Sequence, residues 1–467
     1  MKIEQIYTSC LAQGAYYIES NGEVAIIDPL REVQGYINKA TDDNAKIKYI
    51  FETHFHADFV SGHVTLAEKT GAKIVFGPLA NPNYVFYQAV DNEVFEVGDI
   101  TITALHTPGH TMESTCYLLK DKNKKNCALF SGDTLFLGDV GRPDLAQKLN
   151  EFTQNDLAGF LFDSLRNKIM ILEDDVVVYP AHGAGSACGK NLSSETVGTL
   201  GEQKQSNYAL RANMTKDEFI NEVTDGLLPP PNYFPVNVKL NKEGYGDVAQ
   251  LVQNSKSLDV VAFNAAVKQH KALILDVRHQ DDFCKSHIPN SLFVGIDGGF
   301  APWVGALVSN YKQPIAIVCA AGREAETVTR LARVGFDNVI GYLENGFESW
   351  LDANLEIKSI NGITSAAVQA VYDTNALIFD VRKPGEYQSD HIENAISAPL
   401  DFIYNHLNDF PKNKPFYIHC AGGYRSVIAA SILKANGFDN VIDIKGGFQA
   451  IKTTTIKRTQ SACTLVK

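Results

Sequence analysis

The sequence predicts an α/β protein of three domains: a larger N-terminal domain and then two copies of a smaller domain with a parallel sheet. Three observations support this prediction. The chain has 467 residues, enough for about three domains of roughly 150 residues each. Short apolar runs alternate with helical patterns along its length. A motif set in the C-terminal half occurs twice, about 100 positions apart, far more than the period of a solenoid repeat.

The N-terminal domain is assigned to residues 1–228. Its predicted strands are 23–27, 46–50, 73–76 and 176–179, which alternate with helices. Thr215 and Glu218 form a capping-box pattern that predicts a helix start. The three prolines at 229–231 cannot continue that helix. We therefore expect the domain to end near 228 and residues 229–256 to form an extended connector.

The two repeat domains are assigned to 257–357, the first repeat domain, and 358–460, the second. Residues 276–278 and 380–382 both read Asp-Val-Arg, and 335–340 recurs unchanged at 437–442. In each copy an apolar run, 315–318 or 415–418, fits a buried parallel strand. A loop with a cysteine follows, and then a helical pattern, 327–334 or 427–435. Each copy therefore predicts a strand–loop–helix unit with a thiol at the turn.

Composition excludes several classes of protein. The chain has 42 basic and 54 acidic residues, a formal charge of −12, which disfavours binding to nucleic acid or to anionic membranes. No apolar run reaches the ~18 residues of a membrane span, and the first residues do not resemble a secretion signal. None of the eight cysteines forms a CxxC pair, which argues against a disulfide scaffold or zinc ribbon. We expect a cytoplasmic protein with free thiols that forms a homo-oligomer.

Histidines and aspartates cluster behind apolar runs in the N-terminal domain. One cluster contains His54, His56 and Asp58, and three more are centred on His110, Asp133 and His182. A lone histidine is usually structural, but four such clusters in one domain indicate a shared site. Imidazoles and carboxylates that converge at strand ends are typical ligands of a divalent cation.

These motifs, over 1–228, resemble the metallo-β-lactamase superfamily, whose loop reads His-x-His-x-Asp-His. The resemblance implies an αββα sandwich with the metal at one edge. Phe59 stands where dinuclear hydrolases of the family have the last histidine of the loop. A single ion held by His54, His110 and Asp133 then matches the two-histidine, one-carboxylate set of non-haem Fe(II) oxygenases. Zinc is the alternative, since it takes the same ligands.

The chain is more specifically similar to persulfide dioxygenases fused to rhodanese domains, on segments 28–29, 52–58, 138–144 and 180–186. The resemblance implies one non-haem Fe(II) per chain on His54, His110 and Asp133, with His56, Asp58 and His182 behind the ligands. It implies a low-molecular-weight thiol persulfide, of glutathione, coenzyme A or another small thiol, as the substrate with O₂. Two substrate-binding candidates have structural alternatives. Arg142 either binds the thiol's carboxylate or pairs with Asp144, and Cys188 either accepts persulfide sulfur or only packs.

The cysteine loops differ between the repeats. In the second, Cys420 precedes Gly422, Gly423, Tyr424 and Arg425, so loop amides and a helix N-terminus favour a thiolate. This loop resembles that of rhodanese sulfurtransferases, which implies that Cys420 carries persulfide sulfur, that Arg425 binds an anionic donor, and that the other three residues line the substrate site. In the first repeat Glu324 replaces that arginine, so Cys319 is either a second sulfur site or structural.

The predicted function is therefore oxidation of a thiol persulfide by O₂ to sulfite, together with interconversion of persulfide plus sulfite and thiol plus thiosulfate. Two alternatives remain at this point. One is a zinc-dependent thioester hydrolase resembling glyoxalase II, against which Phe59 speaks. The other is a non-catalytic sulfur carrier or sensor, against which the intact metal motifs speak.

Overall fold

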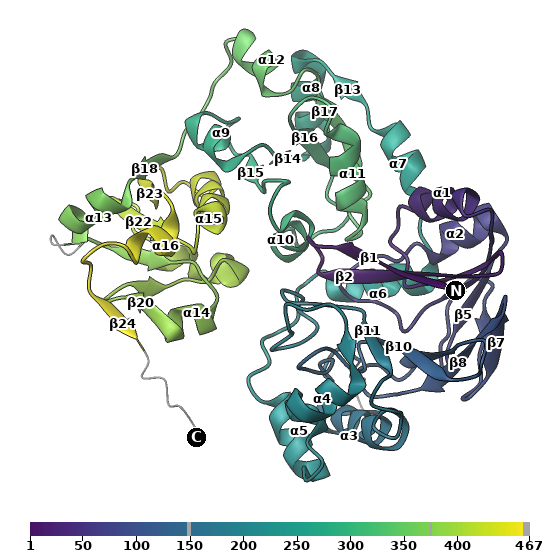
Figure 1. Ribbon diagram of the computed structural model, residues 1–467. Coiled ribbons are helices and arrows are strands. Elements are labelled where there is room, and N and C mark those ends of the chain that lie inside the picture. Colours follow the sequence, from purple (N-terminus) through teal and green to yellow (C-terminus); the bar gives the residue numbers. More distant parts are fainter. Residues whose placement is uncertain (147–150, 373–375, 461–467) are drawn as a thin grey trace. The chain divides into compact units, whose positions relative to one another are not determined.

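The computed structural model describes residues 1–146, 151–372 and 376–460, so Cys463 lies outside the described residues. The chain forms two compact units, one of residues 1–251 with 331–335, the other of 252–330 with 336–467. Figure 1 shows the N-terminal domain in purple to teal and the two repeat domains in green to yellow.

Two six-stranded sheets form the N-terminal domain. The first has the order β1-β2-β3-β4-β5-β6 and the second β12-β11-β10-β9-β8-β7. The strands of the first sheet are β1 (Lys2–Thr8), β2 (Gln13–Ser20), β3 (Glu23–Ile27), β4 (Lys46–Phe51), β5 (Lys73–Phe76) and β6 (Tyr87–Gln88). Those of the second are β7 (Val94–Val97), β8 (Ile100–His106), β9 (Thr115–Lys120), β10 (Asn126–Gly132), β11 (Val177–Pro180) and β12 (Gly198–Thr199).

The helices of this domain cover the outer faces of the two sheets. They are α1 (Gln34–Asp42), α2 (His63–Thr70), α3 (Gln154–Ser164), α4 (Leu200–Ser206) and α5 (Lys216–Thr224), with a π-helical turn at Leu165–Ile169 and a 3₁₀ turn at Tyr208–Leu210. Helix α5 begins after Thr215, whose hydroxyl accepts from the Glu218 amide, so the predicted capping box is confirmed.

Three hydrophobic clusters show the layering. Between the sheets, Ile18 and Phe51 of the first pack with Ile102 and Phe130 of the second. On the outer face of the first sheet, residues of α1 and α2 pack against β2 to β4. On the outer face of the second sheet, residues of α3 to α5 pack against β9 to β11. Strand β2 is buried at nearly every position because both of its faces are covered. The αββα sandwich is therefore confirmed.

The expectation of an extended connector at 229–256 is wrong. After the prolines the chain forms α6 (Phe234–Glu243) and α7 (Val248–Asn254). Pro235 lies in the first turn of α6, where a proline leaves no helical hydrogen bond unmade. Helix α6 buries Phe234, Asn237 and Asn241, and residues up to 251 belong to the same unit as the N-terminal domain. Proline ends one helix here and opens the next.

Both repeat domains contain a five-stranded parallel sheet with equivalent strand orders, β13-β17-β16-β14-β15 in the first and β18-β23-β22-β19-β21 in the second. The first comprises β13 (Ser257–Leu258), α8 (Val260–His270), β14 (Leu273–Asp276), α9 (Gln280–Lys285), β15 (Leu292–Phe293), α10 (Phe300–Leu307), β16 (Ile315–Val318), α11 (Glu324–Ala332), β17 (Val339–Leu343) and α12 (Phe347–Asp352). The shared order confirms the duplication predicted from the sequence.

The second repeat domain adds a small antiparallel pair, β20 with β24, outside its sheet. Its elements are β18 (Asn361–Ile363), α13 (Ser365–Tyr372), β19 (Ile378–Asp380), α14 (Pro384–Ser389), β20 (Asp390–Ile392), β21 (Ile396–Ser397), a 3₁₀ segment (Leu400–Asp409), β22 (Phe416–His419), α15 (Tyr424–Ala435), β23 (Val441–Ile444), α16 (Gly447–Ile451) and β24 (Arg458–Gln460). Within the described ranges, no helix combines the length and apolarity that crossing a bilayer requires.

Candidate metal centre and cysteine loops

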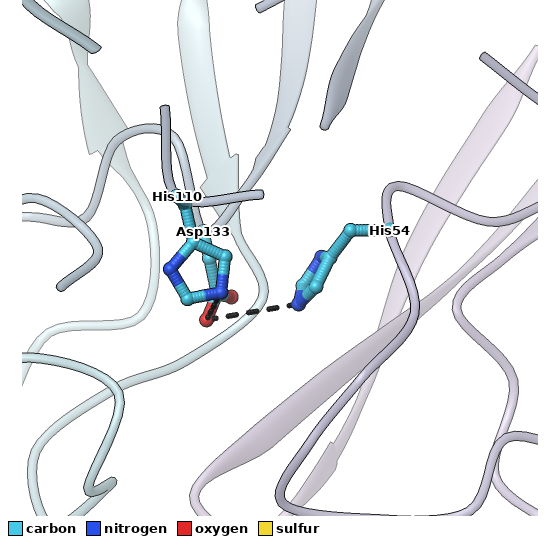
Figure 2. Close-up of side chains that lie close together, drawn as sticks. All are labelled: His54, His110 and Asp133. Atoms are coloured by element: carbon cyan, nitrogen blue, oxygen red, sulfur yellow. Dashed lines mark ion pairs between the residues drawn. The ribbon is translucent and has the colours of Figure 1, made fainter. Parts of the chain in front are cut away.

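Four strands deliver the predicted metal ligands to one edge of the sandwich. His54 follows β4 of the first sheet, whereas His110, Asp133 and His182 follow β8, β10 and β11 of the second. Figure 2 shows His54 on one side of the site, facing His110 and Asp133 on the other. The site therefore depends on the packing of the two sheets against each other.

The first candidate ligand set is His54, His110 and Asp133. Their possible ligand atoms all lie within 4.8 Å of one another, and all three side chains are buried. Asp133 Oδ2 is 3.4 Å from His110 Nε2 and 3.9 Å from His54 Nε2. Neither oxygen of this carboxylate accepts a hydrogen bond from the part of the chain that the structure describes. A buried carboxylate that faces imidazole nitrogens without a donor fits a bound cation.

A hydrogen bond behind each imidazole fixes which nitrogen faces the site. The three contacts are His54 Nδ1 to Thr53 Oγ1 (3.0 Å), His110 Nδ1 to Arg142 O (2.9 Å) and His182 Nδ1 to Ala12 O (3.2 Å). A carbonyl only accepts, and the Thr53 hydroxyl donates its proton to Asp28. Each Nδ1 is therefore the donor, which leaves each Nε2 lone pair free to bind a metal.

A second candidate set, His56, Asp58 and His182, lies beside the first. His182 Nε2 is 3.4 Å from Asp58 Oδ2 and 3.5 Å from Asp133 Oδ1, so Asp133 faces both sets. His56 is drawn toward Asp28, with its Nε2 3.1 Å from Asp28 Oδ1. Burial alone would lower the pKa of His56, but Asp28, Glu52 and Asp58 outweigh it and raise that pKa to about 9.

Phe59 is fully buried against this second set. Its ring packs on the His56 imidazole with centroids 4.3 Å apart. The position at which dinuclear hydrolases have the last histidine of the loop therefore holds an apolar ring here, in contact with a candidate ligand. The second set keeps two imidazoles and a carboxylate but gains no third imidazole from the loop.

Helix α6 supplies two residues that the sequence did not single out. The Asn241 amide donates to the carbonyls of His56 and Phe59 and accepts from the Ser61 amide, so it fixes the loop that carries the ligands. Tyr233, just before the helix, is buried; burial and the charges of Asp58 and Cys188 raise the pKa of its hydroxyl. Both residues fall in the segment expected to be a connector, and no local motif marks them.

A cavity of about 720 Å³ opens beside His110. Its walls are mainly apolar, from Phe55, Met112, Leu145, Phe152 and Val238 among others. Glu113 and Lys242 are the charged residues of the lining, and the Glu113 carboxylate accepts from the Phe55 amide. The Lys242 ammonium lies 4.9 Å from the centre of the Phe55 ring. The cavity can therefore take a small organic ligand that carries an anionic group.

Arg142 pairs with Asp144. Of the two alternatives expected for this arginine, the structure therefore shows the structural pair and not a free carboxylate-binding group. Its Nε and Nη2 donate to the carboxylate at 2.7 Å each, and its remaining donors reach the carbonyls of Ala187 and Leu228. Since the guanidinium is buried and occupied, it is not free to bind a thiol's carboxylate. Its contribution to the site is the backbone carbonyl behind His110.

Cys188 lies at the metal site, with its Sγ within 4.8 Å of ligand atoms of Asp133 and His182. Burial, with the charges of Asp58 and Asp133, raises the pKa of this thiol well above its usual value. Lys190, two residues further along the chain, donates to the carbonyls of Glu222 and Asp225. The described residues thus supply Cys188 with acidic neighbours rather than a nearby ammonium.

In the second repeat domain, Cys420 lies between the end of β22 and the start of α15. The Gly423 amide donates to Cys420 Sγ at 3.1 Å. Gly423 has a φ of 103°, a left-handed conformation that favours glycine. Arg425 forms a bidentate pair with Glu386, at 2.6 and 2.9 Å, so it is not the free anion-binding group that was expected. Gly422 is exposed at the loop, whereas the Tyr424 hydroxyl donates to a backbone carbonyl of the first repeat domain instead of facing an open site.

The equivalent loop of the first repeat domain is arranged differently. The Gly322 amide donates to the Glu324 carboxylate at 3.1 Å. Arg323 pairs with Asp297 and Glu326. A cavity of about 660 Å³ lies at Cys319, but burial, Glu324 and Asp276 raise the pKa of this thiol to about 12. Cys319 is therefore a protonated thiol near neutral pH.

Comparison with known proteins identifies the domains. The metallo-beta-lactamase superfamily model matches residues 10–182, and the rhodanese-like domain model matches 259–353 and 364–454. The crystal structure of a metallo-beta-lactamase from Staphylococcus aureus subsp. aureus COL is 30% identical and covers 73% of this chain and 98% of that chain, with a TM-score of 0.65. The chain belongs to the metallo-β-lactamase superfamily, and its metallo-β-lactamase domain is followed by two rhodanese-like domains.

Other relatives match the N-terminal domain. The probable hydroxyacylglutathione hydrolase glo2 of Schizosaccharomyces pombe is 34% identical over 162 residues, which are 34% of this chain and 58% of that protein. The cytoplasmic hydroxyacylglutathione hydrolase of Arabidopsis thaliana is 35% identical over 147 residues, 30% of this chain and 56% of that protein. The chain thus spans less than two thirds of the length of both. The structure of ETHE1 from Myxococcus xanthus is 26% identical, covers 52% of this chain and 98% of that chain, and has a TM-score of 0.44.

Proposed function

We propose that this protein is a non-haem iron persulfide dioxygenase joined to a rhodanese sulfurtransferase. In the first reaction RSSH, O₂ and H₂O give RSH, sulfite and two protons. In the second, RSSH and sulfite give RSH and thiosulfate. The observation that carries the proposal is the His54, His110 and Asp133 set beside a loop in which Phe59 replaces an imidazole.

His54, His110 and Asp133 would hold an Fe(II) ion, which would supply open coordination positions for the persulfide and O₂. The chain's own residues prepare the site. Thr53 and the Arg142 carbonyl hold the His54 and His110 rings with Nε2 inward. The apolar walls of the neighbouring cavity exclude water from a thiol persulfide, and Lys242 attracts an anionic group on the thiol.

The sulfur-transfer reaction is proposed for Cys420. A thiolate there attacks the outer sulfur of RSSH and the S–S bond of the donor breaks. The leaving thiolate takes up the proton of the donor persulfide and departs as RSH. Sulfite then attacks the outer sulfur of the Cys420 persulfide and releases thiosulfate and the thiolate. The Gly423 amide, directed at Cys420 Sγ, stabilises the anionic sulfur in both half-reactions.

A second candidate, a thioester hydrolase, is favoured by the similarity of the N-terminal domain to hydroxyacylglutathione hydrolases. It also gains support from the adjacent His56, Asp58 and His182 set, which would hold a second ion. Against it stand the apolar ring of Phe59 in contact with His56 and the pairing of His56 with Asp28.

Metal content and product analysis separate the two candidates. Anaerobic loading with Fe(II) is expected to give one iron per chain, with glutathione persulfide driving O₂ uptake and sulfite release. His110→Ala should lose the iron. His106→Ala is the matched control, since His106 is the last residue of β8, the strand that precedes His110, but bonds to the Met112 carbonyl outside the site. Two tightly held zinc ions per chain, with hydrolysis of a glutathione thioester and no O₂ uptake, would replace this proposal with the hydrolase.

A further inference from the structure

A turn of the first repeat domain contacts the cysteine loop of the second, within one compact unit of the chain. The Tyr424 hydroxyl donates to the carbonyl of Gly295 at 2.6 Å. The tyrosine ring meets Phe293 edge to face, with centroids 6.1 Å apart. Tyr424 is the first residue of α15 and directly follows Gly423. The loop of one domain is therefore anchored on another domain.

Two glycines in this turn make room for the tyrosine. A Cβ on Gly298 would lie 2.4 Å from Tyr424 Cζ, and one on Gly295 would lie 3.1 Å from Tyr424 Cε2. Neither glycine is among those with a positive φ, so their backbone conformations suit other residues. At Gly298 the space occupied by the Tyr424 ring, rather than the backbone conformation, requires glycine, whereas at Gly295 the ring shares this role with Phe293 and the Arg278 carbonyl.

A second contact fixes the same helix. The Phe293 amide donates to Ser431 Oγ, in the middle of α15, at 3.1 Å. Figure 1 shows β15, which ends at Phe293, beside α15. The first repeat domain therefore holds both the first turn and the centre of the helix whose N-terminus lies at Cys420. Gly423 has no side chain to restrict its own backbone, so the direction of its amide depends on what holds Tyr424.

The same turn also contacts the cysteine loop of its own domain. Asp297 accepts from Arg323, and the Ile296 carbonyl accepts from Arg330, both at 2.7 Å. Arg323 is the counterpart of Tyr424 in the internal repeat. The turn thus lies between two equivalent loop positions, and in the first repeat domain the adjacent thiol, Cys319, is protonated. The first repeat domain therefore makes contacts that support the cysteine loop of the second repeat domain.

We propose that the first repeat domain is a working part of the second domain's sulfur-transfer site, in which the turn 295–298 holds Tyr424 as a positioning residue for the Gly423 amide and the N-terminus of α15 at Cys420. This inference rests on the proposed sulfurtransferase function of Cys420. Tyr424 acts through the backbone and does not itself contact the sulfur that is transferred.

The test uses full-length variants and two measurements. The first is the rate of Cys420 alkylation by iodoacetamide against pH, read from the Cys420 peptide by mass spectrometry. The second is kcat and KM for sulfur transfer from thiosulfate to cyanide. Gly298→Ala, which lies in the first repeat domain, should move the alkylation midpoint upward by about one pH unit. It should also lower kcat about tenfold, because a thiol that ionises at a higher pH leaves less thiolate for the reaction. Tyr424→Ala should do the same.

Gly299→Ala is the matched control. Its Cβ would meet Trp303 at 3.3 Å, with no atom of Tyr424 within 4 Å, so its profile should match the parent. Tyr424→Phe keeps the ring, so its alkylation midpoint and kcat should lie between those of the parent and of Tyr424→Ala. O₂ uptake should stay at the parental value in all four, and thermal unfolding checks that each variant is folded. If the alkylation profile and kcat of Gly298→Ala match those of Gly299→Ala while the parent transfers sulfur, the inference is wrong. A parent that transfers no sulfur instead refutes the proposed function, and the alkylation profiles still decide whether the turn positions the loop.

Discussion

Cys319 and Cys420 occupy equivalent positions in the two repeats, yet the amides that follow them bond to different acceptors. At Cys420 the Gly423 amide reaches the sulfur. At Cys319 the Gly322 amide reaches the Glu324 carboxylate. A carboxylate that takes the loop amide removes a donor from the thiol and adds a negative charge beside it. Of the differences between the two loops, the exchange of Arg425 for Glu324 is the one that supplies this carboxylate.

We predict that Cys319 reacts slowly with iodoacetamide at pH 8 and that its rate rises about tenfold per pH unit up to pH 11. A thiol with a pKa of about 12 is about one part in ten thousand thiolate at pH 8. Peptide mass spectrometry on the intact chain measures this rate alongside that of Cys420. Glu324→Gln should speed Cys319 alkylation by removing the charge. Equal reactivity of the two cysteines at pH 8 would contradict the prediction.

At the scale of elements, α6 connects the metal loop with the neighbouring cavity. Asn241 on this helix holds the carbonyls of His56 and Phe59. Val238 and Lys242, one turn apart on the same face, line the cavity beside His110. Helix α6 follows all strands and helices of the sandwich along the chain. It nevertheless sets both the shape of the ligand loop and the charge of the cavity.

We predict that Lys242→Met raises KM for glutathione persulfide about tenfold in O₂-uptake assays and leaves kcat within about twofold. A charge-assisted contact to a substrate carboxylate is worth about 1.5 kcal/mol, close to a factor of ten. Lys239→Met, on the same helix, is the control, because Lys239 is exposed and pairs only weakly with Glu243 at 3.8 Å. An equal KM in both variants would mean that the substrate's anionic group does not use this cavity.

For the whole molecule, the metal set and Cys420 lie in different compact units, so one can be removed without the other. Under the proposed function, tethering keeps sulfite from the first reaction at a high local concentration for the second. The two activities should therefore be separable by single substitutions, although the products formed depend on both sites.

We predict that Cys420→Ser abolishes sulfur transfer and leaves O₂ uptake with persulfide at more than about half the parental rate, since the substitution removes only the nucleophile. Sulfite should accumulate in place of thiosulfate, as measured by ion chromatography. His110→Ala is the reciprocal variant and should lose O₂ uptake while it retains transfer from thiosulfate to cyanide. Equal thiosulfate from Cys420→Ser and parent would assign the transfer to another thiol or to uncatalysed chemistry.

Periodicity and motif spacing in the sequence determined much of the fold. The runs at 23–27, 73–76 and 315–318 are strands with those bounds, and Thr215 caps a helix as predicted. The repeated Asp-Val-Arg and Gly-Phe-Asp-Asn-Val-Ile segments predicted two copies of one sheet, which the strand orders confirm. These features are visible in the sequence because each depends on residues a few positions apart or on a copy of the same segment.

Only the tertiary structure decided which side chains are free. Arg425 looks available in sequence, but folding brings Glu386, 39 residues earlier in the chain, against it. Asn241 and Tyr233 reach the metal site from a segment whose prolines indicated a connector. Tyr424 meets a turn more than a hundred residues earlier in the chain. Pairings of this kind depend on distances between distant segments, which the order of residues does not encode locally.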